Sequence, residues 1–92
     1  MERLPDDEIT AAAERLGWER RGDKLVRVVE RKDFGAAMEF VNTVAMLAES
    51  ANHHPDIAIS WNKVELSLWT HTVGGVTAAD VEMAGAIEGL LT

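Results

Sequence analysis

The chain has 92 residues, 47% hydrophobic and 27% charged, with a formal net charge of −7. This length predicts a single domain over residues 1–92, with a thin core that oligomer formation would supplement. The acidic charge disfavours direct nucleic-acid binding, because phosphate contacts need basic side chains. There is no cysteine, which excludes disulfides and thiolate chemistry and fits a reducing cytoplasm.

Membrane insertion is not expected from the hydropathy pattern. No apolar run approaches the roughly 20 residues that a membrane-spanning helix needs. Residues 1–8 are largely polar and lack the apolar stretch of a signal peptide. We therefore expect a cytoplasmic protein with no membrane association.

Residues 6–16 predict the first helix. One buried face is indicated by apolar residues at helical spacing, namely Ile9, Ala12, Ala13 and Leu16. Asp6 is the expected N-cap, and Gly17 is the expected end.

Residues 18–30 predict a β-hairpin. Its strands are expected at 18–21 and 24–30, joined by a turn at Gly22-Asp23. In the second strand, Leu25, Arg27 and Val29 alternate with Val26, Val28 and Glu30.

Residues 34–51 predict the longest helix, capped by Asp33. One apolar stripe comprises Phe34, Ala37, Met38, Val41, Ala45 and Ala48, and a second row comprises Phe40, Val44 and Leu47. We expect one stripe to pack on the sheet. The second row is either a subunit interface or part of a broad core face.

A second pair of strands is expected at 57–61 and 63–70, tightly turned near Asn62-Lys63. Alternation places Val64, Leu66 and Leu68 on one covered face. Gly74-Gly75 should end the strand. Thr77 and Asp80 resemble a capping box, which opens a final helix that runs to about Leu91.

The element order is therefore helix, two strands, helix, two strands, helix. Strand pairs with tight connections favour an antiparallel sheet. The predicted fold class is α+β, a two-layer sandwich of a four-stranded antiparallel sheet with helices on one face (α-ββ-α-ββ-α).

Three histidines occur in the chain, His53, His54 and His71. The first two follow the long helix and precede Pro55, and the third closes a strand. Histidine titrates close to neutral pH, so two of them suit a reaction that gives one proton and takes another. Polar surface residues, or half of a metal site, are the alternatives that the spacing leaves open.

The segment from Glu49 to Asp80 resembles the signature of the pterin-4a-carbinolamine dehydratase family. The resemblance is carried by Glu49, His53-His54-Pro55, Trp61-Asn62-Lys63-Val64, Thr70-His71, Gly75, Thr77 and Asp80. It extends upstream to Gly17-Trp18 and Lys32-Asp33-Phe34, and so covers nearly the whole chain.

The resemblance implies the same sheet and helices, and a homodimer or homotetramer. It implies a hydro-lyase that removes water from 4a-hydroxytetrahydropterin, giving quinonoid dihydropterin, in support of tetrahydropterin recycling. The functional link would be to an aromatic amino acid hydroxylase that leaves this substrate behind. Neither a metal nor an organic cofactor is implied.

The resemblance also assigns the site residues. His53 and His71 match the principal acid–base pair, with the choice of acid and base left open, and His54 is expected to position the pterin. Glu49 would orient a histidine. Asp80 is either a site residue or only a helix cap, and Trp18 either stacks on the pterin or lies in the core.

Two further tryptophans bear on the site. Trp61 matches a position that is usually aromatic in the family, and we expect it to pack there. Trp69 stands where relatives often carry a small residue. By alternation Trp69 shares a face with His71, where it would narrow the pocket, stack on a ligand or join a subunit contact.

Two other functions are compatible with the resemblance. Some relatives are dimerising cofactors of transcription factors or assembly chaperones for RuBisCO, roles that need no histidines. A pterin enzyme linked to molybdopterin metabolism would keep the same pocket. The complete histidine set argues against a purely non-catalytic member, and a protein with both a dehydratase and a binding role is also compatible with it.

Overall fold

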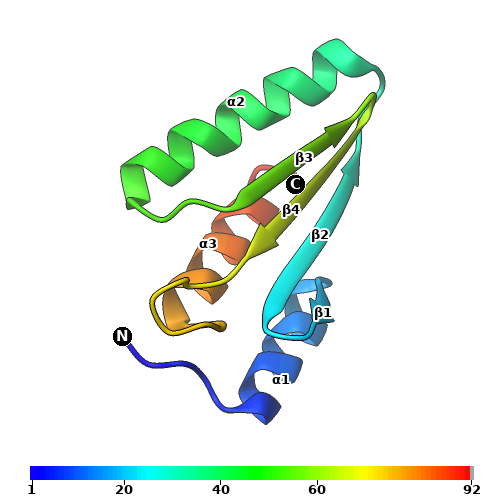
Figure 1. Ribbon diagram of the computed structural model, residues 1–92. Helices are drawn as coiled ribbons and strands as arrows, with labels where there is room; N and C mark the ends of the chain where they lie inside the picture. Colours follow the sequence, from blue (N-terminus) through cyan, green and yellow to red (C-terminus); the bar gives the residue numbers. More distant parts are fainter. Residues whose placement is uncertain (92) are drawn as a thin grey trace.

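The computed structural model describes residues 1–91 and contains three helices and four strands (Figure 1). The element order is the one predicted from the sequence. The elements are α1 (Asp6–Leu16), β1 (Glu19–Arg21), β2 (Lys24–Glu30), α2 (Phe34–Ala51), β3 (Asp56–Ser60), β4 (Lys63–Leu68) and α3 (Ala78–Gly89).

The four strands form one antiparallel sheet in the order β1-β2-β4-β3. The two long strands β2 and β4 lie at its centre, where Val29 pairs with Val64 and Leu25 with Leu68. These four side chains are buried, because side chains alternate across a strand and these share the face that the helices cover. The predicted α+β class, with helices on one face, is confirmed.

A single hydrophobic cluster lies between the sheet and the helices. Its sheet members include Leu25, Val64, Leu66 and Leu68, none of which is exposed. Each helix contributes to the same cluster, for example with Ile9 from α1, Val44 from α2 and Ile87 from α3. The core thus fixes all three helices against one sheet face.

The start of α1 differs from the prediction. The N-cap is Pro5, and Asp6 is already the first helical residue, with no capping bond from a side chain. The Asp6 carboxylate instead accepts hydrogen bonds from Arg20, at 2.8 Å, and Arg3, at 3.0 Å. These bonds, that from Arg20 first, hold the pKa of Asp6 below its ordinary value. The predicted end is confirmed, because Gly17 adopts a left-handed conformation with φ of 75°.

Helix α2 has the predicted bounds and the predicted cap, since Asp33 accepts a 2.8 Å hydrogen bond from the backbone N–H of Ala36. Its buried face draws on both predicted apolar rows, as Ala37, Phe40, Val44 and Ala48. Phe40 and Val44 therefore belong to the core. Phe34, from the other row, is 51% exposed.

The β3–β4 turn lies one residue earlier than predicted. Strand β3 ends at Ser60, so Trp61 and Asn62 form the turn, and Trp61 has a φ of 54°. Asn62 takes the buried position, and its Nδ2 donates to the backbone carbonyl of Arg31 at 3.0 Å. Trp61 is left 68% exposed, so the expectation that it packs is wrong within this chain.

Four further boundaries differ from the predictions. Strand β1 begins at Glu19 and β3 at Asp56, each one residue from the expected start. Strand β4 ends at Leu68, although Thr70 still forms an isolated bridge with Gly75. Helix α3 begins after the predicted cap Thr77 but ends at Gly89, not near Leu91. None of the helices within residues 1–91 is both long and apolar enough to cross a membrane.

Candidate functional site

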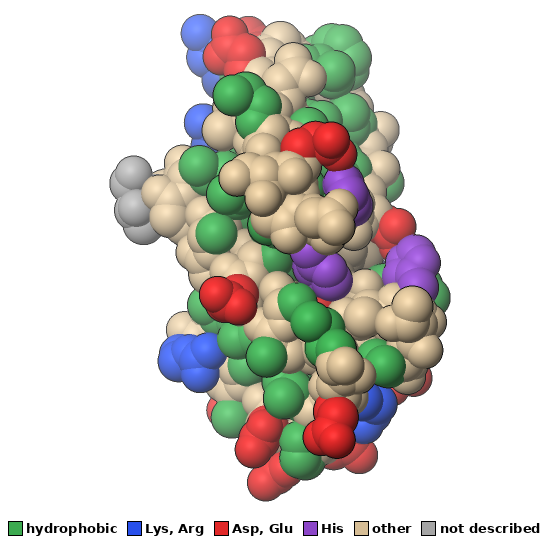
Figure 2. Space-filling model, turned by 90° about the vertical axis from the view of Figure 1, so that its left-hand side faces the viewer, with side chains coloured by type: hydrophobic (Ala, Val, Ile, Leu, Met, Phe, Trp, Pro, Cys, Tyr) green, Lys and Arg blue, Asp and Glu red, His purple; other side chains and the backbone are tan. Residues whose placement is uncertain are grey.

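The three histidines lie around one hollow at the end of the sheet where β3 begins and β4 finishes. Asp56 pairs with Ser67, so the segment entering β3 lies beside the segment leaving β4. Figure 2 shows the histidines, in purple, gathered on one face of the molecule. The hollow, called the histidine pocket below, has a volume of about 400 Å³ and is lined by Asn52, His53, His54, Trp69, Thr70, His71 and Thr72.

The end of α2 sets the directions of the first two histidines. Asn52 adopts a left-handed conformation with φ of 52°, and the N–H of His53 still donates to the carbonyl of Ala48 at 3.1 Å. The chain then leaves the helix before Pro55, which favours an extended residue at His54. Adjacent side chains therefore reach different partners.

His53 is held by a buried carboxylate. Its Nε2 lies 2.5 Å from Oδ1 of Asp80, a residue with no exposed surface. The other carboxylate oxygen accepts hydrogen bonds of 2.8 Å from the backbone N–H of Thr77 and from the hydroxyl of Thr70. Asp80 thus caps α3 and orients His53 at once.

This bonding pattern selects a tautomer of neutral His53. The Asp80 carboxylate acts as an acceptor at both oxygens, so we assign the ring proton to Nε2 of His53. The lone pair then lies on Nδ1, which has no hydrogen-bond partner within residues 1–91. Nδ1 is consequently the nitrogen that can exchange a proton with a ligand.

His54 has an exposed carboxylate partner. Its Nε2 lies 2.6 Å from Oε1 of Glu49, one helical turn earlier at the end of α2. Both side chains are open to solvent, at 54% and 79% exposure. Exposed pairs of this kind contribute little to stability, so Glu49 restrains His54 only weakly.

His71 lies in the loop between β4 and α3. This loop is closed by backbone hydrogen bonds between Thr70 and Gly75, and Gly74 takes a left-handed φ of 65°. The imidazole of His71 stacks on the indole of Trp69, with ring centroids 4.0 Å apart and an angle of 30° between planes. Trp69 and His71 were expected on the same face, and their rings are in contact.

Trp18 is not part of the histidine pocket. The residue is 5% exposed, within the core, and its Nε1 donates a 2.8 Å hydrogen bond to Oε1 of Glu88 in α3. Arg27 donates to the same carboxylate oxygen, also at 2.8 Å. These contacts join β2, α3 and the entry to β1, and leave Trp18 no open face toward the histidines.

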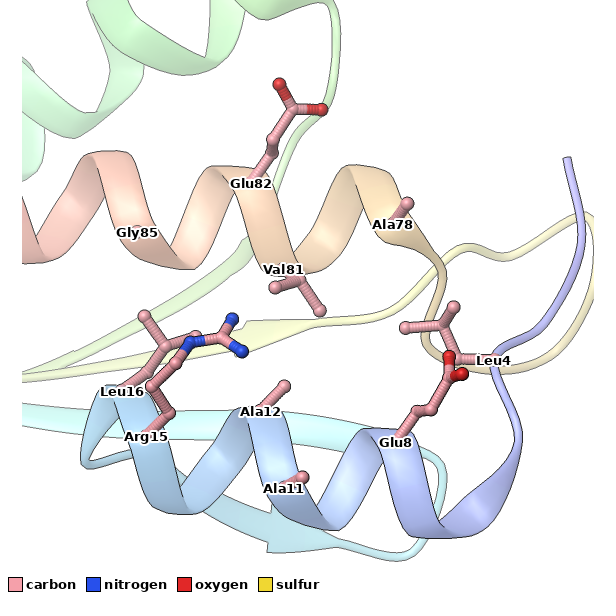
Figure 3. A pocket seen from close by; sticks show the side chains of 10 residues that line it. All are labelled: Leu4, Glu8, Ala11, Ala12, Arg15, Leu16, Ala78, Val81, Glu82 and Gly85. Atoms are coloured by element: carbon pink, nitrogen blue, oxygen red, sulfur yellow. The ribbon is translucent and has the colours of Figure 1, made fainter.

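A larger hollow, of about 650 Å³, lies between α1 and α3 (Figure 3). Val81 and Ala12 point into it from the two helices, and Glu8, Arg15 and Glu82 supply its charged groups. None of its lining residues is a histidine. Within residues 1–91, no three His, Cys, Asp or Glu side chains are placed to hold a metal ion. The three histidines line the histidine pocket and not this larger hollow.

Comparison with known proteins identifies the family. The family described as pterin 4 alpha carbinolamine dehydratase matches residues 2–90. The chain belongs to this family. A protein of Thermomicrobium roseum, provisionally named a pterin-4-alpha-carbinolamine dehydratase, is 52% identical over 85 residues, which cover 91% of each chain. A protein of Thermosynechococcus vestitus with the same provisional name is 44% identical over 90 residues, covering 97% of this chain and 95% of its own.

A solved structure agrees with this assignment to the pterin carbinolamine dehydratase family, and a second one shares the fold. A crystal structure described as a transcriptional coactivator/pterin dehydratase from Brucella melitensis has a TM-score of 0.92 and 32% identity, covering 99% of this chain and 100% of its own. A pterin dehydratase-like RuBisCO assembly factor of the alpha-carboxysome shares the fold, with a TM-score of 0.68 at 21% identity over 79% of this chain and 87% of its own.

The sequence does not single out Thr70 as a member of this site. The family resemblance includes Thr70 without giving it a role, yet its hydroxyl links Thr77, at 2.9 Å, to Asp80, at 2.8 Å. A threonine that follows a strand and faces a predicted capping box is the available signal. The signal is weak, because it depends on how the loop from residue 70 to 75 closes.

Proposed function

We propose that this protein dehydrates a 4a-hydroxytetrahydropterin to quinonoid dihydropterin, with His53 and His71 as the acid–base pair. The observation that carries the proposal is that His53 and His71 line the same pocket. His53 is also hydrogen-bonded to the buried carboxylate of Asp80. Family membership supplies the substrate class.

The reaction needs one proton delivered and one removed. The C4a–O bond breaks and the hydroxyl leaves as water after accepting a proton, while the adjacent ring nitrogen loses its proton. His53 suits the role of base, because the Asp80 carboxylate stabilises the imidazolium that forms when Nδ1 accepts a proton. His71 then serves as the acid. The role proposed for His54, whose Nε2 lies 2.6 Å from Oε1 of Glu49, is to position the pterin.

A non-catalytic binding role on the same fold is the competing function. Such a role makes no use of a histidine oriented by a buried carboxylate, nor of the Thr77–Thr70–Asp80 hydrogen bonds behind it. These buried contacts therefore favour the dehydratase. A complex whose affinity survives loss of the histidines, in a protein without dehydratase activity, would favour the binding role instead.

The experiment follows the absorbance of freshly generated 4a-hydroxytetrahydropterin with and without the protein. Wild type should accelerate water loss over buffer, and His53→Ala and His71→Ala should each lower kcat by about 10²-fold or more. Circular dichroism must show that both variants are folded. No acceleration by wild type would refute the proposal, and unchanged rates in folded variants would refute the two assigned roles.

A homodimer or homotetramer belongs to the same proposal. Several apolar side chains are exposed on the isolated chain, among them Phe34, Met46, Ile57 and Ile59. Association would bury such surface, which a chain of this size cannot cover by itself. Sedimentation velocity should give a mass of two or four chains, and a monomer at all concentrations would contradict this part.

A further inference from the structure

We propose that Trp69 is a positioning residue that holds the imidazole of His71 in its working orientation. This inference rests on the proposed function and extends it to a residue with no role in the acid–base scheme. The indole and imidazole are stacked with centroids 4.0 Å apart, and both residues line the histidine pocket.

The indole is itself fixed by the sheet. The β3–β4 register pairs Asp56 with Ser67, so Asp56 lies diagonally across from Trp69 on the same sheet face. Oδ2 of Asp56 accepts a 3.0 Å hydrogen bond from Nε1 of Trp69. This bond holds the plane of the indole relative to β3.

The neighbouring strand contributes a second contact. Leu25 pairs with Leu68, so the same register continued by one residue places Lys24 opposite Trp69. Nζ of Lys24 lies 4.9 Å from the centroid of the indole ring, a cation–π distance. Trp69 is therefore held from β2 and from β3, the strands on either side of β4.

His71 has no comparable support of its own. Its side chain makes no hydrogen bond within residues 1–91, and the residue is exposed in a turn. The stack on Trp69 is thus the contact that orients this ring. In effect Trp69 does for His71 what Asp80 does for His53.

Catalysis by a proton carrier depends on its geometry, so loss of this stack should act on the chemical step. Misplacing a reacting group by about 1 Å is enough to cost up to roughly 10²-fold in rate. Removing the indole should lower kcat more than it raises KM, because the transition state requires the correct imidazole position. A phenyl ring at residue 69 should preserve part of the effect, because it can stack on His71 but cannot donate to Asp56.

The test compares Trp69→Ala and Trp69→Phe with wild type, using Trp61→Ala as the matched control. Trp61 is an exposed tryptophan in the β3–β4 turn and does not line the pocket. One readout is the NMR shift of the His71 ring protons, which the ring current of a stacked indole displaces. The other readout is a pair of kinetic constants, kcat and KM, measured separately for each variant.

The expected result has four parts. Trp69→Ala moves the His71 ring signals toward those of free histidine and lowers kcat by about 10-fold or more, with KM changed by less than about 3-fold. Trp69→Phe, which can stack but cannot donate to Asp56, recovers part of both properties, and Trp61→Ala changes neither. Unchanged His71 signals in folded Trp69→Ala would overturn the proposal. A raised KM at constant kcat would also overturn it, since the indole would then bind the pterin directly.

The NMR arm separates this inference from the proposed function, because it needs no substrate. If wild type fails to dehydrate the pterin while the His71 signals respond as expected, the dehydratase proposal falls and the orientation of His71 by Trp69 stands. If wild type is active and the signals do not respond, only the role of Trp69 is refuted.

Discussion

Asp80 bonds His53 through one carboxylate oxygen, at 2.5 Å, while its other oxygen accepts the N–H that opens α3, at 2.8 Å. One buried side chain therefore caps a helix and fixes a histidine. The position of the imidazole is thereby coupled to the start of α3.

Asp80→Asn should abolish most activity while leaving the fold intact. The amide can still accept the capping hydrogen bond with its oxygen, but its NH₂ then faces Nε2 of His53. That arrangement favours the proton on Nδ1 and removes the proposed base. We expect kcat to fall by about 10²- to 10⁴-fold, by analogy with carboxylate-to-amide changes next to catalytic histidines. Steady-state kinetics and circular dichroism test this.

Asp33→Asn is the matched control for that change. Asp33 caps α2 through Ala36 and does not line the histidine pocket. Asparagine is as good an N-cap as aspartate, so both activity and thermal midpoint should stay close to wild type. If both variants lost activity equally, the loss in Asp80→Asn would come from helix capping and not from the orientation of His53.

Thr70→Val should weaken the support that Asp80 gives to His53, because Thr70 donates a hydrogen bond to the other oxygen of the Asp80 carboxylate. It removes the hydroxyl that donates to Asp80 at 2.8 Å and leaves the remaining groups part-buried. A lost hydrogen bond of this kind costs about 1–3 kcal/mol of unfolding free energy, and kcat should fall by less than in Asp80→Asn. Urea denaturation measures the first effect. Thr43→Val, which removes an exposed hydroxyl on α2, should cost within about 0.5 kcal/mol.

Glu49→Gln should have only a small effect. The Glu49–His54 pair is exposed, so solvent competes for both groups and screens their attraction. We expect kcat/KM to change by no more than about 3-fold. A drop of 10-fold or more in a folded variant would mean that Glu49 acts on the reaction itself and would contradict the weak restraint assigned to the Glu49–His54 pair.

Asp6 should contribute stability that disappears in acid. Its pKa is lowered by the hydrogen bonds from Arg20 and Arg3, so the folded state favours the carboxylate. The contribution is present above the ordinary pKa of 3.8 and is lost as pH falls through the lower folded-state value. The difference in thermal midpoint between wild type and Asp6→Asn should be constant from neutral pH to about 4 and shrink below it. Asp7→Asn is the control, and a pH-independent difference would contradict the assignment.

The secondary structure could be predicted where local signals agree. Helix α2 combines an apolar period with the Asp33 cap, and β2 combines alternation with a Gly22-Asp23 turn. The approach of His71 to His53 also follows from sequence, because antiparallel pairing of β3 with β4 brings those two ends together. The family resemblance assigned their roles.

Other features depend on contacts between distant residues and were not predictable. Aspartate is a common N-cap residue, yet the Asp6 carboxylate accepts a hydrogen bond from Arg20 in β1 and makes no capping bond. Trp61 is apolar, yet Asn62 takes the inward turn position because its amide reaches the Arg31 carbonyl. The stacking of Trp69 on His71 needs both the strand face and the conformation of the following loop.

The most direct measurement is the dehydration rate of 4a-hydroxytetrahydropterin with His53→Ala, His71→Ala and the double variant, with and without added imidazole. The account predicts that each single variant loses about 10²-fold or more, that the double variant is little worse than the slower single one, and that imidazole restores part of the rate. Folded single variants that retain the wild-type rate would contradict the central claim that these two side chains carry the protons.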